Sequence, residues 1–448
     1  MKRLLWTIGL SASALAGITV TGVVGLVSSA RTIMAAPDPA RFAAVVAAPA
    51  PRHDPTRPTV AIVLGDTRTE ATDFLAPYAM LAESGAYNVY AVADTREPRT
   101  LAGGVDVLPQ LSFAELDERV PAGPDVILTP AITEIGSPAN LPLLEWLRRH
   151  GERATLFSWC AGAEVLAASG LIDGRSVTTH WEDIDSFEGR YPGIDWRRGV
   201  RYVDDGNLLT TGGLTAGIDG TLHFLATRNG RDVAARVAEA MHYPGSPFAA
   251  DPRAPQYSIE PVDAAVYLNL AFNQPKSTAA IWLYDGIGEV DLAAAVEAFA
   301  VTSTNATTTV ATVPAVVSQH GLQLVPRRPA DEATRVDRVL VPGGTGASEA
   351  AARIPAGLLG PGREPTLLQD ERTPAYAFTT DLQELAASHD VVIAEQAARH
   401  LEVRSPMELI GPRWSTRVMV VALVAAIAGA ALLWGAVRLA RKARRHGA

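Results

Sequence analysis

Short apolar stretches alternate with longer amphipathic stretches along residues 59 to 242. The apolar stretches are rich in Val, Ile and Leu and are bounded by turn-forming residues, which is typical of strands buried in a parallel sheet. We expect strands at 59–64, 87–92, 125–129 and 155–158, a hairpin arm at 101–109, a hairpin at 200–211, and helices at 72–84, 138–150, 215–227 and 233–242. Strands that alternate with helices predict an α/β fold with helices on both faces of a mostly parallel sheet.

The same pattern starts again in the second half of the chain. Both starts consist of a strand, a loop, an aspartate (Asp73 or Asp291) and an apolar helix, which indicates an internal repeat. We therefore expect a first domain at 59–245, a proline-rich connector at 246–277 and a second, partial copy at 278–403. The two copies could pack as an intrachain pseudo-dimer, and a homodimer is the alternative.

Both ends of the chain are apolar. Residues 4–30 carry no charge and are long enough to span a bilayer, and a cleaved signal peptide is the alternative. Residues 418–437 are a stronger transmembrane candidate because a basic tail at 438–448 follows them. Basic residues at both ends predict two cytoplasmic termini and an extracytoplasmic body at the cytoplasmic membrane. Residues 31–58 are rich in Pro and Ala and indicate a linker.

Charge excludes one class of partner. Residues 1–30 and 414–448 hold eight basic residues and no acid, so the other 31 of the 39 basic residues face all 48 acids, and residues 31–413 carry a net charge of −17. A body this acidic repels phosphate, so we expect no nucleic-acid partner. The single cysteine excludes an intrachain disulfide.

That cysteine, Cys160, lies between the apolar stretch at 155–158 and a helix that we expect to start near Gly162. A nucleophile at a strand-to-helix turn is the arrangement of a nucleophile elbow. The helix N-terminus would favour the thiolate. The alternative is a cysteine that acts only as a small buried hydrophobic residue.

His180 and Asp73 are the candidate partners of the cysteine. His180 follows twenty residues after Cys160 and would serve as a base or an ion-pair partner, unless it is only a packing histidine. Asp73 would complete the group, unless it only complements the charge of a helix N-terminus, and Glu70 is a weaker candidate for this role. The backbone N–H groups of Ala161 and Ala131 would stabilise an oxyanion. The nine histidines are scattered along the chain, so we expect no metal site and no cofactor.

These residues resemble the ThiJ/PfpI family of the class I glutamine-amidotransferase-like superfamily, in particular its isonitrile-hydratase-like branch, which also forms the sensor half of some AraC-type regulators. The resemblance covers about 59–242 and rests on Ser-Trp-Cys-Ala-Gly-Ala at Cys160, Thr-Thr-His-Trp at His180, and the segment around Asp73. It implies a flavodoxin-like fold, a Cys160 nucleophile, a functional His180, an Asp73 that hydrogen-bonds the cysteine, and a small-molecule substrate.

Three departures from the family pattern refine this hypothesis. Pro130-Ala131-Ile132 stands where the family usually has Pro-Gly-Gly, and Ala161 replaces a hydroxyl residue frequent in the hydratases. No helix-turn-helix domain follows, which argues against a transcription factor. The first hypothesis is a membrane-anchored protein whose cysteine attacks an isonitrile, amide or aldehyde in hydratase or hydrolase chemistry. The alternative is a non-catalytic module that binds a small molecule or senses redox state through Cys160.

Overall fold

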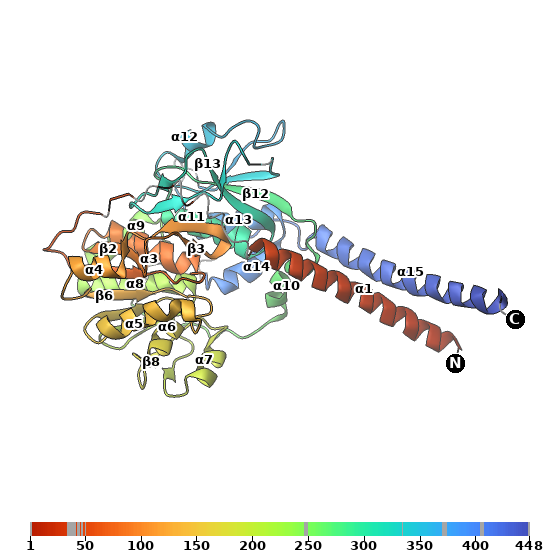
Figure 1. Cartoon of the computed structure of the whole chain (residues 1–448), viewed down its shortest axis with the longest axis horizontal. Coiled ribbons are helices and arrows are strands. Elements are labelled where there is room, and N and C mark those ends of the chain that lie inside the picture. Colours follow the sequence, from red (N-terminus) through yellow and green to blue (C-terminus); the bar gives the residue numbers. More distant parts are fainter. Residues whose placement is uncertain are drawn as a thin grey trace.

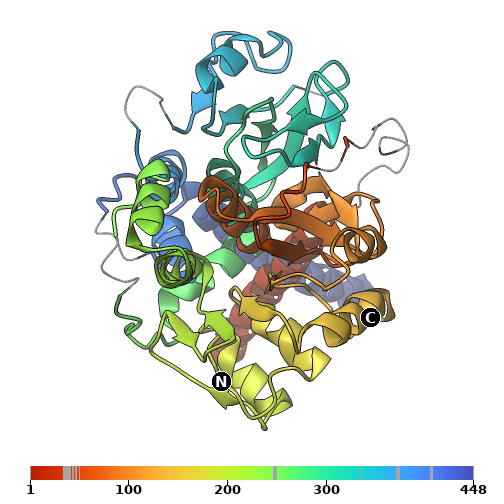
Figure 2. The ribbon, with the colours of Figure 1, turned by 90° about the vertical axis from the view of Figure 1, so that its left-hand side faces the viewer.

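The computed structural model describes residues 2–33, 42, 45, 48–49, 51–245, 250–333, 335–369, 374–403 and 407–446. An α/β body carries two long helices, α1 (Lys2–Ile33) and α15 (Thr416–His446), which project from it side by side (Figure 1). Figure 2 looks onto the end of the body that lies away from the two long helices, so that both helices are behind it. Residues 34–41, 43–44, 46–47 and 50 of the linker expected at 31–58 lie outside the described residues, as do the last two residues of the expected basic tail.

The first unit is built on a seven-stranded sheet in the order β10-β11-β7-β6-β1-β2-β5, parallel except for β10. Its strands are β1 (Thr59–Val63), β2 (Asn88–Ala93), β5 (Leu111–Ser112), β6 (Val126–Thr129), β7 (Thr155–Ser158), β10 (Tyr202–Asp204) and β11 (Leu208–Thr211). A separate parallel pair is formed by β8 (Ser176–Val177) and β9 (Asp195–Trp196). The α/β fold with a mainly parallel sheet, predicted from the alternating pattern, is confirmed.

Helices cover both faces of this sheet because successive strand residues point to opposite sides. Val60 and Ile62 share a core with α3 (Ala71–Glu83), α8 (Leu214–Arg228) and α9 (Arg231–Ala240). Ala61 and Val63 face the other side. The helices there are α4 (Phe113–Arg119), the 3₁₀ turn η2 (Pro138–Asn140) with α5 (Leu141–His150), α6 (Gly162–Ser169) and α7 (Ile184–Arg190).

The second unit repeats the strand order of the first. Its parallel sheet runs β16-β13-β12-β17-β18, which corresponds to β5-β2-β1-β6-β7. Its strands are β12 (Ser277–Trp282), β13 (Asn305–Ala311), β16 (Arg328–Pro329), β17 (Arg338–Val341) and β18 (Thr366–Leu367). Its helices are α11 (Glu289–Val296), the π-helical turn η5 (Glu297–Val301), α12 (Ala347–Ala352), α13 (Ala377–Ser388) and α14 (Val391–His400).

The two units pack on each other within one chain. Helices α3 and α11 lie against one another between the two sheets (Figure 1), and a single hydrophobic core runs through both units. A four-stranded antiparallel sheet joins a hairpin of each unit in the order β14-β15-β4-β3. Its strands are β3 (Arg99–Leu101), β4 (Val105–Leu108), β14 (Val316–Val317) and β15 (Gln323–Val325), with the turn η1 (Ala102–Gly104) between β3 and β4. The cysteine site therefore has the second unit as a fixed neighbour.

The helices α1 and α15 meet the body at α10 (Ala265–Phe272), which follows the turn η4 (Pro261–Ala264). The Ser29 hydroxyl donates to the Leu270 carbonyl at 2.8 Å. Small residues let the two long helices approach closely, since a Cβ on Gly17 would lie 2.3 Å from the Ala425 carbonyl oxygen. The spans Leu10–Arg31 (22 residues) and Thr416–Leu439 (24 residues) are long and apolar enough to cross a membrane, by length and composition alone.

Candidate functional site

Cys160 occupies a strained turn between β7 and α6. Its φ is 52°, in the left-handed region that a non-glycine residue rarely adopts. The Cys160 N–H donates to the Gly212 carbonyl at 3.1 Å, and the Thr179 hydroxyl donates to the Cys160 carbonyl at 3.0 Å. Gly162 lets the turn approach β6, because a Cβ there would lie 2.0 Å from the Thr129 oxygen. The surroundings thus hold the thiol in a fixed position at the carboxyl edge of the sheet.

Asp73 lies beside this thiol, in the first turn of α3. The carboxyl is fully buried, its Oδ2 accepts the Ala131 N–H at 3.0 Å, and its Oδ1 has no hydrogen-bond partner among the described residues. Burial and the charge of Glu70 raise the pKa of Asp73 well above the usual value. The nearby Cys160 side chain lowers this pKa, but its effect is smaller. Asp73 therefore holds a proton more readily than an exposed aspartate does.

The pKa of the Cys160 thiol is also raised. Burial, followed by the charges of Asp73 and Asp183, raises the pKa of Cys160 well above that of a free thiol, and the Ala161 N–H only partly opposes this. The N–H at the helix start favours the thiolate as expected, but burial and the neighbouring carboxyl groups outweigh it, so the thiol is not activated. Cys160 and Asp73 form a buried thiol–carboxyl pair, and burial favours the protonated form of both groups.

The two N–H groups expected to stabilise an oxyanion are both engaged. Ala131 N–H is held by Asp73, and Ala161 N–H interacts with the Cys160 side chain. A free oxyanion hole requires donors aimed at the substrate oxygen. The structure therefore places both N–H groups at the site, but Ala131 donates to the Asp73 carboxyl and Ala161 to the Cys160 sulfur.

His180 lies near the turn without hydrogen-bonding the sulfur. Its Nε2 lies 2.9 Å from the His400 carbonyl oxygen, and its Nδ1 accepts the Glu182 N–H at 3.4 Å, so both ring nitrogens have other partners. Burial and the neighbouring His400 lower the pKa of His180 to about 4, which leaves the ring neutral at pH 7. An ion pair between His180 and Cys160 is therefore not formed.

The second unit supplies a carboxyl that the sequence analysis missed. Glu297 is 3% exposed, accepts the Thr72 hydroxyl at 2.9 Å, and starts the π-helical turn that follows α11. Burial and the adjacent Glu70 raise the pKa of Glu297 well above its usual value. Its signal in the sequence was an acid inside an otherwise apolar helix, which is costly without a partner.

A cavity of 590 Å³ lies between the units next to these groups. Asp183, Glu297, Trp181 and Tyr267 are among its lining residues, so it combines carboxyl groups with aromatic surface. Burial, then the charge of Glu182, raises the pKa of Asp183 to about 6. Asp183 raises the pKa of Cys160 and Asp73 raises that of Glu297, so the lining of the cavity is electrostatically coupled to the pair, and the cavity is the candidate approach for a small molecule.

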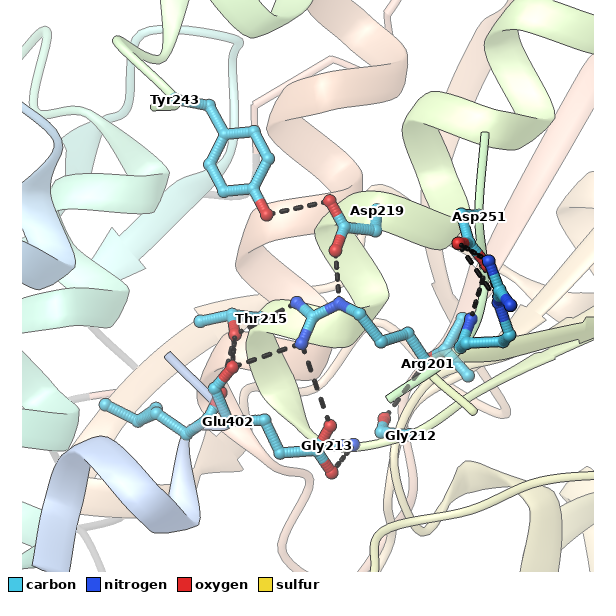
Figure 3. Close-up of polar contacts among 11 residues, drawn as sticks. Arg201, Gly212, Gly213, Thr215, Asp219, Tyr243, Asp251 and Glu402 are labelled. Carbon is cyan, nitrogen blue, oxygen red and sulfur yellow. Dashed lines mark hydrogen bonds and ion pairs between the residues drawn. The ribbon is translucent and has the colours of Figure 1, made fainter. Parts of the chain in front are cut away.

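The segment after α14 anchors the second unit to the first (Figure 3). Arg201 and Asp219 form an ion pair that is 1% and 0% exposed, and Tyr243 OH donates to Asp219 at 2.7 Å. Glu402 closes the cluster, because its carboxylate accepts the Gly213 N–H at 2.8 Å and its carbonyl accepts from Arg201 at 3.1 Å. Gly213 caps α8 and directly follows Gly212, whose carbonyl accepts the Cys160 N–H, so this cluster links the second unit to the cysteine turn.

The raised pKa of the thiol predicts a slow reaction with alkylating reagents at pH 7. We expect the rate of iodoacetamide modification of Cys160 to rise at a higher pH than that of free N-acetylcysteine measured in parallel. Asp73→Asn removes the carboxylate whose charge raises the pKa of Cys160 in the alkaline range where the thiol ionises, so we expect the profile to move to lower pH. Mass spectrometry of the intact chain measures the rate without interference, because Cys160 is the only cysteine. If the rate of Cys160 modification rises at a lower pH than that of the free thiol, this electrostatic assignment is contradicted.

Comparison with known proteins identifies the family of the first unit. A ThiJ/PfpI family protein from Pseudomonas syringae aligns with a TM-score of 0.38 and 26% identity, over 46% of this chain and 87% of that one. The HTH-type transcriptional regulator CdhR of Pseudomonas aeruginosa is 39% identical over 98 residues, which are 22% of this chain and 29% of the regulator. The isonitrile hydratase of Pseudomonas putida is 32% identical over 186 residues, or 40% of this chain and 77% of that enzyme. Residues 58–227 match the DJ-1/PfpI family, and the chain belongs to it.

Proposed function

We propose that the protein is a cysteine-dependent hydratase for a small molecule with an isonitrile-like carbon. The observation that carries the proposal is the buried pair of Cys160, on a strained turn, and Asp73, in which burial favours a proton on both groups. The similarity to an isonitrile hydratase supports the same chemistry. Both partners of the pair lie on rigid elements, so their geometry is set before a substrate binds.

The chemistry uses the two protons that the pair holds. The Cys160 sulfur forms a bond to the terminal carbon of the isonitrile while a proton passes through Asp73 to the same carbon, which gives a thioimidate. Water then adds to that carbon, the nitrogen takes up a proton, and the C–S bond breaks to release an N-substituted formamide and the thiol. This route needs a proton donor and no oxyanion hole. Amide hydrolysis would need free N–H donors, and Ala131 and Ala161 are both engaged.

The test is turnover by the full-length chain, purified in detergent micelles, on alkyl and aryl isonitriles, with amides and 2-oxoaldehydes for comparison. We expect more than one equivalent of formamide per chain from the isonitriles, and none from the Cys160→Ser variant. Formamide is quantified by NMR. No turnover with any isonitrile would overturn the proposal.

A binding or sensing module is the second candidate, and the closed position of the thiol favours it. Cys160 is only 6% exposed, so a reactive molecule would need the turn to open. The partial identity with a transcriptional regulator is consistent with a sensing role. This candidate predicts saturable adduct formation or binding that ends at one equivalent, which the same turnover assay measures.

We also propose that α1 and α15 anchor the protein in the cytoplasmic membrane with an extracytoplasmic body. Support comes from their apolar length and from the basic residues at both ends of the chain. Protease added outside spheroplasts is expected to digest the body and to leave an epitope placed after His446 protected. A protected body would contradict this topology.

A further inference from the structure

Two histidines and a glutamate from distant parts of the chain meet beside the cavity. The ligand-capable atoms of His180, Glu182 and His400 all lie within 4.8 Å of one another. His180 and Glu182 follow β8 in the first unit, whereas His400 is the last residue of α14 in the second. The packing of the two units therefore assembles the cluster, which is why histidines scattered along the sequence gave no metal signal.

One ligand is already fixed in a suitable tautomer. Since the partner of His180 Nε2 is a carbonyl, Nε2 carries the proton and Nδ1 carries the lone pair. A metal-bound histidine commonly donates its other N–H to a carbonyl or carboxylate in this way. The Glu182 N–H makes only a long hydrogen bond of 3.4 Å to Nδ1, which a metal ion can replace.

The other ligands have suitable spacing and freedom to move. His400 Nδ1 lies 3.4 Å from Glu182 Oε2, close to the separation of about 3.4 Å between neighbouring ligand atoms in a tetrahedral zinc site. Their side chains are 31% and 36% exposed, so small rotations can close the remaining gap to His180. Asp183 Oδ2 lies 3.9 Å from His180 Nδ1 and offers a fourth ligand. The cavity, which Glu182, Asp183 and His400 line, gives an ion access.

We propose that His180, Glu182 and His400 bind one divalent first-row transition-metal ion, such as Zn²⁺, and so cross-link the two units beside the cysteine site. Two imidazoles with a carboxylate suit Zn²⁺, Co²⁺ or Ni²⁺ better than Mg²⁺ or Ca²⁺, which prefer oxygen ligands. The proposal does not rest on the hydratase function, because the ligand atoms bind whether or not Cys160 turns over a substrate.

A metal-free ion pair is the competing explanation of the same geometry. Burial opposes a charge on His400, but the hydrogen bond and the charge of Glu182 outweigh it and raise the pKa of His400. In that case Glu182 and His400 would pair without an ion, and His180 would not take part.

The test is titration of the full-length chain with Zn²⁺ by isothermal calorimetry, after EDTA treatment and with a tag that contains no histidine. We expect one site per chain and at least a tenfold weaker affinity in His400→Ala and in Glu182→Gln. His223→Ala is the matched control. His223 does not belong to the cluster, and its Nε2 lies 2.8 Å from Asp204 Oδ2. Co²⁺ in place of Zn²⁺ is expected to give visible absorption bands that disappear in His400→Ala.

Each outcome decides the proposal. The proposal is overturned if His400→Ala, Glu182→Gln and the control His223→Ala all bind Zn²⁺ as weakly as the wild type does. It is also overturned if the wild-type chain takes up no ion. Thermal unfolding of the metal-free variants shows whether His400→Ala is still folded. If it is not, Glu182→Gln, which preserves the size of the side chain, carries the test alone.

Discussion

Replacing Asp73 by Asn is expected to lower kcat/KM for isonitrile hydration by about 10³, because the amide cannot transfer a proton to the isonitrile carbon. The carboxyl is buried, its pKa is raised by burial and by Glu70, and it is held in place by the Ala131 N–H. Asn keeps the size of the side chain and an oxygen that can accept that N–H, so the fold should survive. Product formation at subsaturating isonitrile measures the loss.

Asp232→Asn, on the exposed face of α9, is the control for this variant and should leave kcat/KM unchanged. The Asp73→Asn variant should also react faster with iodoacetamide while it turns over more slowly. This opposite response of thiol reactivity and turnover separates loss of a proton donor from general damage to the site. Turnover of Asp73→Asn within threefold of the wild type would show that another group delivers the proton.

The sequence predicted the first unit well because each of its strands is a continuous apolar stretch bounded by turns. The helices expected at 138–150 and 215–227 correspond to η2 with α5 and to α8. The short helix α4 was missed, although Ser112 and Glu115 form a capping box that marks its start. Helices α12, α13 and α14 were missed. Helices α13 and α14 pack on each other, and α13 also packs on α11, so their burial depends on tertiary contacts that a local pattern does not contain.

The sequence predicted only those parts of the site that belong to local motifs. Cys160 and Asp73 meet as expected, since both follow strands that end at the same edge of the sheet. The surroundings of His180 depend on His400, which is 220 residues away, and those of Asp73 depend on Glu297 in the second unit. Such contacts arise from the packing of two units, so neither the ionisation of the thiol nor the partner of the histidine could be derived from spacing.

Arg201→Met is expected to destabilise the body by about 3–5 kcal/mol, because it leaves the Asp219 carboxylate buried without its partner. The change also removes a donor to the Glu402 carbonyl, which helps hold the second unit on the first. For a body of this size we expect the midpoint of thermal unfolding to fall by about 4–7 °C. Scanning fluorimetry of the full-length chain, in the same detergent for every variant, measures this shift.

The double variant Arg201→Met with Asp219→Leu distinguishes an unpaired charge from lost packing. Replacing both partners of a buried ion pair by apolar residues is often close to neutral, so the double variant should recover most of the lost stability. Arg253→Met removes the exposed pair with Asp251 and should not shift the midpoint. If the double variant is as unstable as Arg201→Met, the loss comes instead from the contacts of Arg201 with Glu402 and Thr215, and the anchoring of the second unit outweighs the ion pair in holding the site together.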